Sequence, residues 1–384
     1  MTGPQAARPH VYFQNLNAIR FIAAFLVIVH HVEQFRWLFH LPNHWDNRIV
    51  ALFGELGVVL FFVLSGFLIS YLLFKEQAVT GTIRVKDFYT RRALRIWPLY
   101  FLVVLSALFV LPFAPFFTIP GFGRDAVWSN LAYKLALFVF FLPNLVLTWL
   151  GLVPYASQAW SIGAEEQFYL VWPLLNRKAG NRWTLMLAVI GGYLSLKALW
   201  AFLPAGESLA VLRDFWATTP IDCMAIGGLF ALVVHEDGSR VEALRRLVYS
   251  REVQWLALLS AIACVSVGFT PPHLRREFYS VLFGILICNF AANPRRIFSM
   301  ETAWSSYLGK ISYGLYMYHP LAIVLSIRLL QSLGAMSGSL LYPLACLMTV
   351  AIAALSYEAF EKRFIRKKLR FSALISGDNA TQAS

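Results

Sequence analysis

The stretch LNAIRFIAAFLVIVHHVEQFRWL, residues 16–38, decides the fold of this 384-residue chain. It is apolar and long enough to cross a bilayer as one helix, since about 20 residues span the hydrocarbon core. Arg20 lies near its start, and His31 follows eleven positions later. Eleven residues at about 100° each make roughly three whole turns, so both side chains share one face, about 16 Å apart. Because a cation inside a bilayer is costly, we expect both to face a polar cavity within a helical bundle.

The composition indicates an integral membrane protein. Apolar residues make up 59% of the chain and charged residues only 14%, so water-compatible side chains cannot cover its surface. The net charge of +13 is gathered in short segments between apolar runs, as in cytoplasmic loops, which argues against a nucleic-acid partner. All four cysteines lie in apolar runs, with no CxxC pair and no histidine at metal-binding spacing. We therefore expect neither a disulfide nor a bound metal.

The apolar runs predict an all-α, polytopic fold with about ten transmembrane helices. Strongly basic and weakly charged connections alternate, and the positive-inside rule places the basic ones in the cytoplasm. This alternation holds only if residues 127–175 cross the membrane once. We therefore expect residues 127–150, which Pro143 interrupts, to be a re-entrant or interfacial segment. The predicted spans are residues 16–38, 49–74, 93–111, 158–175, 183–203, 215–235, 253–270, 278–292, 307–330 and 340–360.

Both termini are cytoplasmic in this topology. Residues 1–15 form a cytoplasmic N-terminal segment and residues 16–364 form the membrane domain. Residues 365–384 are expected to be basic at first and then disordered, because the end of the chain is short and polar.

A group of arginines stands where a basic loop enters the third span, in FYTRRALRIWPLY, residues 88–100. Arg91, Arg92 and Arg95 there could serve only as positive-inside anchors. Arg92 and Arg95, however, are three residues apart and share one helical face, a geometry that can hold a phosphate at the membrane surface.

Other titratable residues lie inside the spans. Glu165 and Glu166 stand in the apolar segment QAWSIGAEEQFYLVW, residues 158–172, where carboxylates usually pair with a cation such as Arg20 or act in chemistry. Asp222 stands alone after Pro220, and neither a structural nor a functional role is favoured for it. His319 follows an aromatic run, so it could equally be a core residue hydrogen-bonded to a tyrosine.

These residues fit two classes of protein. A proton-coupled solute transporter would use buried arginine, glutamate and histidine as a relay. A membrane enzyme would use the imidazole as general base or nucleophile and the loop arginines to bind a phosphorylated donor. We favour the enzyme, because the sequence shows no repeated halves with helices broken at corresponding positions.

The order of these motifs resembles a large family of integral-membrane acyltransferases, acyltransferase family 3. The opening segment resembles the pattern that aligns Arg20 and His31 with the family's essential arginine and histidine. The similar segments are residues 15–31, FFVLSGFLI at 61–69, RALRIWPLY at 92–100, WSIGAEEQFYLVWP at 160–173, SYGLYMYHP at 312–320 and YEAFEKRF at 357–364.

The resemblance implies transfer of an acyl group, usually acetyl, from cytoplasmic acetyl-CoA to a hydroxyl of an extracytoplasmic or lipid-linked carbohydrate. It also implies a multi-pass protein of the bacterial inner membrane, surrounded by lipids and acting alongside polysaccharide-assembly proteins. In the simplest mechanism His31 deprotonates the acceptor hydroxyl, while Arg20 stabilises negative charge. An acyl-His31 intermediate is the rival route, and His30 points about 100° away. The implied sites are catalytic His31, Arg20, Glu165 and Glu166; donor-binding Arg91, Arg92 and Arg95; and substrate-binding Ser65, Asp222, Tyr316 and His319.

Departures from the family pattern qualify these expectations. Pro220 stands where the family often has an arginine two residues before Asp222, which weakens the transfer of a role to Asp222. Arg363 replaces a proline in the closing motif. The sequence has no SGNH esterase-like domain after its last span, so we expect the membrane domain to complete the transfer or to pass acyl groups to a partner. The acceptor stays open among exopolysaccharide, O-antigen, peptidoglycan, glucans that receive succinyl, and small macrolides.

The topology can be tested with reporter fusions after Arg177 and at Ser384. Both reporters should register the cytoplasm, because both positions adjoin strongly basic segments. An extracytoplasmic signal at either position would overturn the ten-span arrangement.

Overall fold

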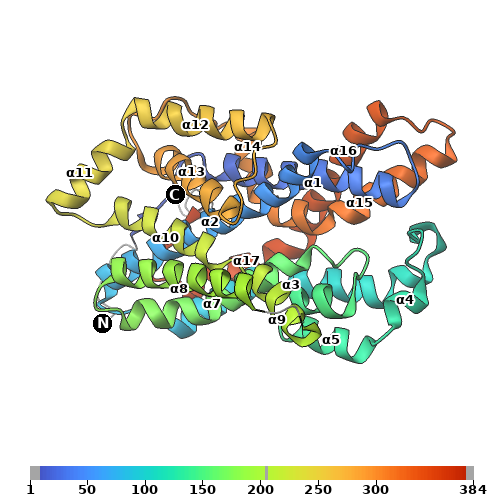
Figure 1. Ribbon diagram of the computed structural model, residues 1–384, viewed down its shortest axis with the longest axis horizontal. Coiled ribbons are helices and arrows are strands. Elements are labelled where there is room, and N and C mark those ends of the chain that lie inside the picture. The colour runs from blue at the N-terminus through green and yellow to red at the C-terminus, as the bar shows by residue number, and fades with distance from the viewer. Residues whose placement is uncertain (1–8, 204–205, 378–384) are drawn as a thin grey trace, which may run out of the picture.

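The computed structural model describes residues 9–203 and 206–377, and these residues are mainly α-helical, as predicted (Figure 1). The first helices are α1 (Leu16–Leu38), α2 (Arg48–Thr80), α3 (Val85–Phe109), α4 (Arg124–Trp128), α5 (Leu131–Val139), α6 (Pro143–Leu145), α7 (Ala159–Lys178), α8 (Arg182–Phe202) and α9 (Glu207–Ala217). They are followed by α10 (Ile221–His235), α11 (Ser239–Val248), α12 (Arg251–Ser266), α13 (Arg275–Ala292), α14 (Ala303–Lys310), α15 (Ser312–Ser332), α16 (Gly338–Ser356) and α17 (Lys362–Lys368). Short turns are η1 (Leu111–Phe113), η2 (Pro115–Phe117), η3 (Val146–Leu150), η4 (Tyr357–Glu361) and η5 (Leu369–Phe371).

The long helix α2 forms the centre of the bundle. It packs against α1, α7, α10 and α13. In its most apolar 18-residue window 72% of the residues are buried, compared with 11% in α8, so α8 lies at the periphery. Asn47 caps the start of α2, its side chain accepting a hydrogen bond from the Ile49 amide at 2.9 Å.

Two glycines allow α2 and α10 to approach closely. A Cβ atom on Gly66 would lie 1.9 Å from the backbone oxygen of Met224, and one on Gly227 would lie 2.1 Å from that of Val63. No other residue type fits at this separation, and small residues are the usual means of close helix packing in membranes. The contact therefore fixes α10 against the middle of α2.

Six helical segments among the described residues are long and apolar enough to cross a membrane. They are residues 16–38, 48–80, 85–113, 182–202, 209–235 and 338–371, and they match six of the ten predicted spans. The other four predicted spans correspond to α7, α12, α13 and α15, which are shorter or carry more polar residues. The chain is thus a multi-pass, all-α membrane protein, and the count of ten spans stays a prediction.

The segment 127–150 does not form a spanning helix. It is divided among the end of α4, α5, α6 and the π-helical turn η3, and its longest helix, α5, has nine residues. Pro143 begins α6 after a break at residues 140–142. This geometry agrees with the prediction that the segment makes no independent crossing.

The two ends of the described chain pair with each other. Strand β1 (His10–Val11) runs parallel to β2 (Ile375–Ser376), so both ends lie on the same side of the bundle. Here the structure differs from the expected disordered tail. Leu374 is buried and Arg91 donates a hydrogen bond to the Phe371 oxygen at 2.8 Å, because apolar residues continue after the basic run. Residues 378–384 lie outside the described part.

The α2–α10 contact can be tested with Gly66→Ala. The added methyl group must displace the Met224 backbone, and overpacking of this kind costs about 1–3 kcal/mol, so the midpoint of thermal unfolding in detergent should fall by several degrees. Gly192→Ala on α8 is the matched control, since a Cβ there has no neighbour within 4 Å. Equal midpoints for the two variants would contradict the close contact.

Candidate active site

Three contiguous cavities run through the bundle. The first, here called the basic cavity, lies beside the paired chain ends and has a volume of about 90 Å³. It shares Arg20, Arg92 and Arg95 with the central cavity of about 100 Å³. The central cavity in turn shares Phe62 and Tyr316 with the histidine cavity, of about 390 Å³. The three cavities therefore adjoin in series from the side of the chain ends to the histidines, and we call this series the path.

The basic cavity is lined by positive charge without a compensating carboxylate among its described lining residues. Its basic residues are Arg20, Arg92, Arg95, Lys310 and Lys368. The Arg92 guanidinium lies over the rings of Phe88 and Tyr169, at 5.8 and 5.9 Å, and its Nε atom is buried without a hydrogen-bond partner in the described chain. Such a cluster attracts a polyanion, because opposite charge and unused donors are both available to it.

Sequence reasoning identified two of these cations as donor-binding residues and missed two others. Lys310 and Lys368 come from α14 and α17, far apart in the chain, and their charges were attributed to loop anchoring. No spacing rule connects them to Arg92. Packing does so instead, because α17 contacts α3, which carries Arg92, and α14 contacts α1, which carries Arg20.

Arg91 differs from Arg92 and Arg95. It forms an ion pair with Glu76 at 2.8 Å and also donates to the Phe371 oxygen. It is absent from the described lining of the basic and central cavities. The structure therefore separates Arg91, which holds the end of the chain in place, from the two arginines that it was predicted to assist.

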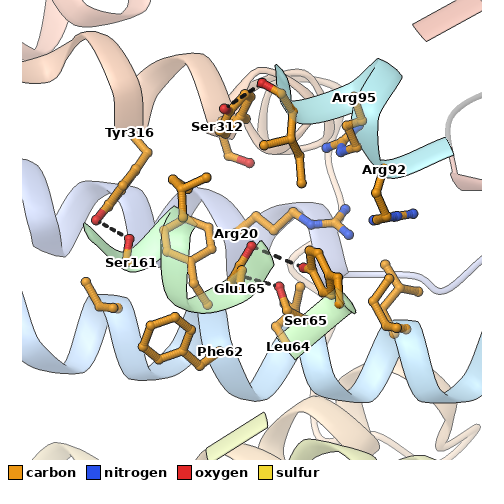
Figure 2. A pocket seen from close by; sticks show the side chains of 18 residues that line it. Arg20, Phe62, Leu64, Ser65, Arg92, Arg95, Ser161, Glu165, Ser312 and Tyr316 are labelled. Carbon is orange, nitrogen blue, oxygen red and sulfur yellow. Dashed lines mark hydrogen bonds between the residues drawn. The ribbon is translucent and has the colours of Figure 1, made fainter. Parts of the chain in front are cut away.

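The central cavity contains one of the two neighbouring glutamates (Figure 2). Glu165 accepts hydrogen bonds from the Ser65 hydroxyl at 2.8 Å and from the Tyr169 hydroxyl at 3.1 Å. Glu166 points in another direction and accepts from the Trp97 indole at 2.9 Å, as expected for adjacent residues about 100° apart on a helix. Arg20 lines the same cavity as Glu165 and donates to Asn17 at 2.9 Å. Glu165 is thus the carboxylate that faces the path.

His31 lines the histidine cavity, whereas Arg20, which was expected to face one cavity together with His31, lines the two neighbouring cavities. The Nδ1 atom of His31 lies 2.8 Å from the Val27 oxygen. A carbonyl oxygen only accepts, so in this hydrogen bond Nδ1 carries the proton, and the Nε2 atom of the neutral ring keeps its lone pair. His31 therefore has a fixed ring orientation and a basic nitrogen free for chemistry.

Two further histidines surround His31. The His319 ring centre is 4.6 Å away, and its Nδ1 atom bonds the Tyr316 oxygen at 2.6 Å. The His30 ring centre is 4.9 Å away, and its Nδ1 atom bonds the Val50 oxygen at 2.8 Å. His30 was expected to point away from the site, but it also lines the histidine cavity, because this cavity is wide enough to reach both faces.

Among the remaining predicted substrate-binding residues, some line the path and one does not. Ser65 lines the central cavity. Tyr316 stands where the central and histidine cavities meet, and its hydroxyl is 2.7 Å from that of Ser161. Asp222 is fully buried, lies outside the described lining of all three cavities, and has neither carboxylate oxygen hydrogen-bonded within the described chain. Asp222 therefore does not line the path.

Comparison with known proteins now adds to this geometry. The family model described as an acyltransferase domain, that of acyltransferase family 3, matches residues 13–358. The chain belongs to this acyltransferase family. The resemblance inferred from the motifs is confirmed, because the match covers nearly the whole membrane domain.

Two relatives illustrate the family. Peptidoglycan O-acetyltransferase OatA of Listeria monocytogenes is 25% identical over 380 residues, which cover 95% of this chain and 57% of the relative. O-acetyltransferase OatA of Staphylococcus aureus is 27% identical over 383 residues, which cover 93% of this chain and 58% of the relative. The chain therefore spans a little over half the length of these relatives. No solved structure matches it.

Proposed function

We propose that this protein is a membrane O-acyltransferase that moves an acyl group, most simply acetyl, from acyl-CoA to a hydroxyl of a carbohydrate across the bilayer. The observation that carries the proposal is the series of adjoining cavities from the basic cavity to the one that His31 lines. The names of the two relatives support an acetyl donor and an oxygen acceptor, with a peptidoglycan-type glycan as one candidate. In the predicted topology the donor enters from the cytoplasmic side of the inner membrane.

The basic cavity suits coenzyme A because that molecule carries a pyrophosphate and a further phosphate at one end. Arg92, Arg95, Lys310 and Lys368 supply charge-assisted donors for these groups. The flexible, uncharged pantetheine arm can then extend along the central cavity toward His31. The lining of the central cavity offers apolar side chains and hydroxyls to such an arm, beside the charged Arg20, Arg92, Arg95 and Glu165.

Arg20 lies at the end of the path where the donor is proposed to bind. It lies eleven residues from His31 on one helix, which corresponds to about 16 Å along the axis. A single reacting carbonyl cannot touch both groups. We therefore assign Arg20 to holding the donor, in place of the charge stabilisation at the reacting carbon that the motif suggested.

The transfer itself centres on the Nε2 atom of His31. In the direct route Nε2 takes the proton of the acceptor hydroxyl, the hydroxyl oxygen bonds to the thioester carbon, and the carbon–sulfur bond breaks. The proton then passes to the thiolate of coenzyme A. In the two-step route Nε2 bonds to the thioester carbon and the carbon–sulfur bond breaks, which releases the thiolate of coenzyme A. The acceptor hydroxyl oxygen then bonds to the acyl carbon, the carbon–nitrogen bond breaks, and the hydroxyl proton passes to the thiolate. Both routes need the free lone pair that the Nδ1 contact with Val27 leaves on Nε2.

Donor binding can be tested by replacing Arg92 and Arg95 together with alanine. Each charged contact to phosphate is worth roughly 1.5–3 kcal/mol, so affinity for acetyl-CoA should fall at least 100-fold in titration calorimetry of the purified protein. The matched control replaces Arg366 and Arg370, which are exposed on the same side, and should change the affinity less than twofold. Unchanged affinity in the Arg92 and Arg95 variant would remove the donor site.

Turnover can be tested with His31→Gln in proteoliposomes that receive labelled acetyl-CoA and a peptidoglycan-type glycan. The variant should bind acetyl-CoA normally but release no coenzyme A, because the proposed base or nucleophile of both routes is removed. His30→Gln is the matched variant in the same cavity and should retain most activity. Equal release by the wild type and His31→Gln would exclude His31. Uptake of a solute without thioester consumption would favour a transporter.

A further inference from the structure

A second large pocket lies beside the histidine cavity and is not used by the mechanism above. It has a volume of about 630 Å³ and is enclosed by α8, α9 and the segment that leads into α13. It shares Glu55, Arg275 and Arg276 with the histidine cavity. We call it the tryptophan pocket, after Trp200 and Trp216 in its wall. Because of the shared residues, a molecule held in this pocket is next to the chamber that contains His31.

The wall of the tryptophan pocket is aromatic and has unused hydrogen-bond donors. Tyr193 stacks on Trp216 with ring centres 4.7 Å apart and an angle of 20° between the planes. The indole Nε1 atoms of Trp200 and Trp216 are both buried and have no hydrogen-bond partner within the described chain. Buried donors are rarely left unpaired, and each such group is a place where a ligand oxygen can bind. Aromatic faces with nearby donors suit a sugar ring, which has apolar C–H faces and a rim of hydroxyls.

The same pocket carries an excess of positive charge. Glu55 pairs with both Arg275, at 2.8 Å, and Arg276, at 3.0 Å, so one carboxylate serves two guanidinium groups. Arg213 lines the pocket as well, and its contact with Asp214 is 3.8 Å long between half-exposed side chains. Lys197 is paired with Glu277 at 2.5 Å. The unbalanced charge at Arg275 and Arg213 favours an anionic ligand.

We propose that the tryptophan pocket binds the acceptor and that the acceptor is an anionic carbohydrate. Its sugar ring lies against Trp200 and Trp216, and its carboxylate or phosphate pairs with Arg213 and Arg275. The neighbouring sugar then extends past Glu55 and Arg276 into the histidine cavity, where its hydroxyl meets His31. This inference rests on the proposed function and adds to it the charge of the acceptor and the residues that select it.

The test compares acceptors of different charge with full-length protein in nanodiscs of neutral lipid. The acceptors are the carboxylated disaccharide of N-acetylglucosamine and N-acetylmuramic acid, the neutral disaccharide chitobiose, and chitobiose linked to polyprenyl pyrophosphate. Arg213→Gln should raise the KM for an anionic acceptor at least tenfold, with kcat and acetyl-CoA affinity changed less than twofold. Trp200→Leu should raise the KM for all three acceptors, since it removes the surface on which the sugar lies.

Arg124→Gln is the matched control, because Arg124 is a half-exposed arginine outside the described lining of the pocket. It should leave all three KM values unchanged. The acceptor whose KM responds to Arg213→Gln identifies the source of the anion: the sugar carboxylate if the free disaccharide responds, and the lipid pyrophosphate if the linked chitobiose responds.

Direct binding separates failure of this inference from failure of the proposed function. Quenching of tryptophan fluorescence by the anionic acceptors, measured in His31→Gln, should disappear in the Trp200→Leu background. Binding without any acyl transfer by the wild type would leave the pocket assigned and reject the proposed function. Acyl transfer whose KM values are unchanged in Arg213→Gln and Trp200→Leu would reject the pocket as the acceptor site and leave the proposed function standing. Competition by anionic phospholipid vesicles that contain no sugar would also reject the pocket as the acceptor site.

Discussion

A row of positive charges can exist inside a membrane protein only where helices separate it from lipid. Arg20, Arg92 and Arg95 line the basic and central cavities, where helices surround them. Among these helices, α2 is the most buried. The position of α2 depends on its contact with α10, where Gly66 and Gly227 bring the two backbones together. The positions of the polar residues along the path therefore depend on a close helix contact that contains no polar side chain itself.

The path also separates two kinds of environment along one helix. At one end of α1, Arg20 lies among cations suited to phosphates, and three turns later His31 lines a wider chamber that also holds Glu55, Arg275 and Arg276. Under the proposed function, the phosphates of the donor stay at the first end, and its long uncharged arm extends to the second.

Sequence periodicity predicted the parts of the site that lie on one helix. The spacing of Arg92 and Arg95 placed both on one face, and they line the same two cavities. Arg20 and His31, which were placed on one face in the same way, line different cavities of the path. Contributions from separate helices were not predictable in this way. Lys310, Lys368 and Trp200 become neighbours of the path only through packing, and Arg91 is removed from it by Glu76. The helical angle of about 100° between His30 and His31 does not give the width of a cavity, and His30 lines the same cavity as His31.

The histidine cluster explains why a neutral base is compatible with so buried a position. His30, His31 and His319 each bond a backbone carbonyl oxygen through Nδ1, so none needs a charged partner to hold its orientation. Three adjacent imidazolium ions would repel one another, which disfavours a second positive charge next to the first. While His31 holds a proton, protonation of the two neighbouring rings is therefore disfavoured. Under the proposed function, that proton passes to the departing thiolate of coenzyme A, and the ring is neutral again for the next acceptor.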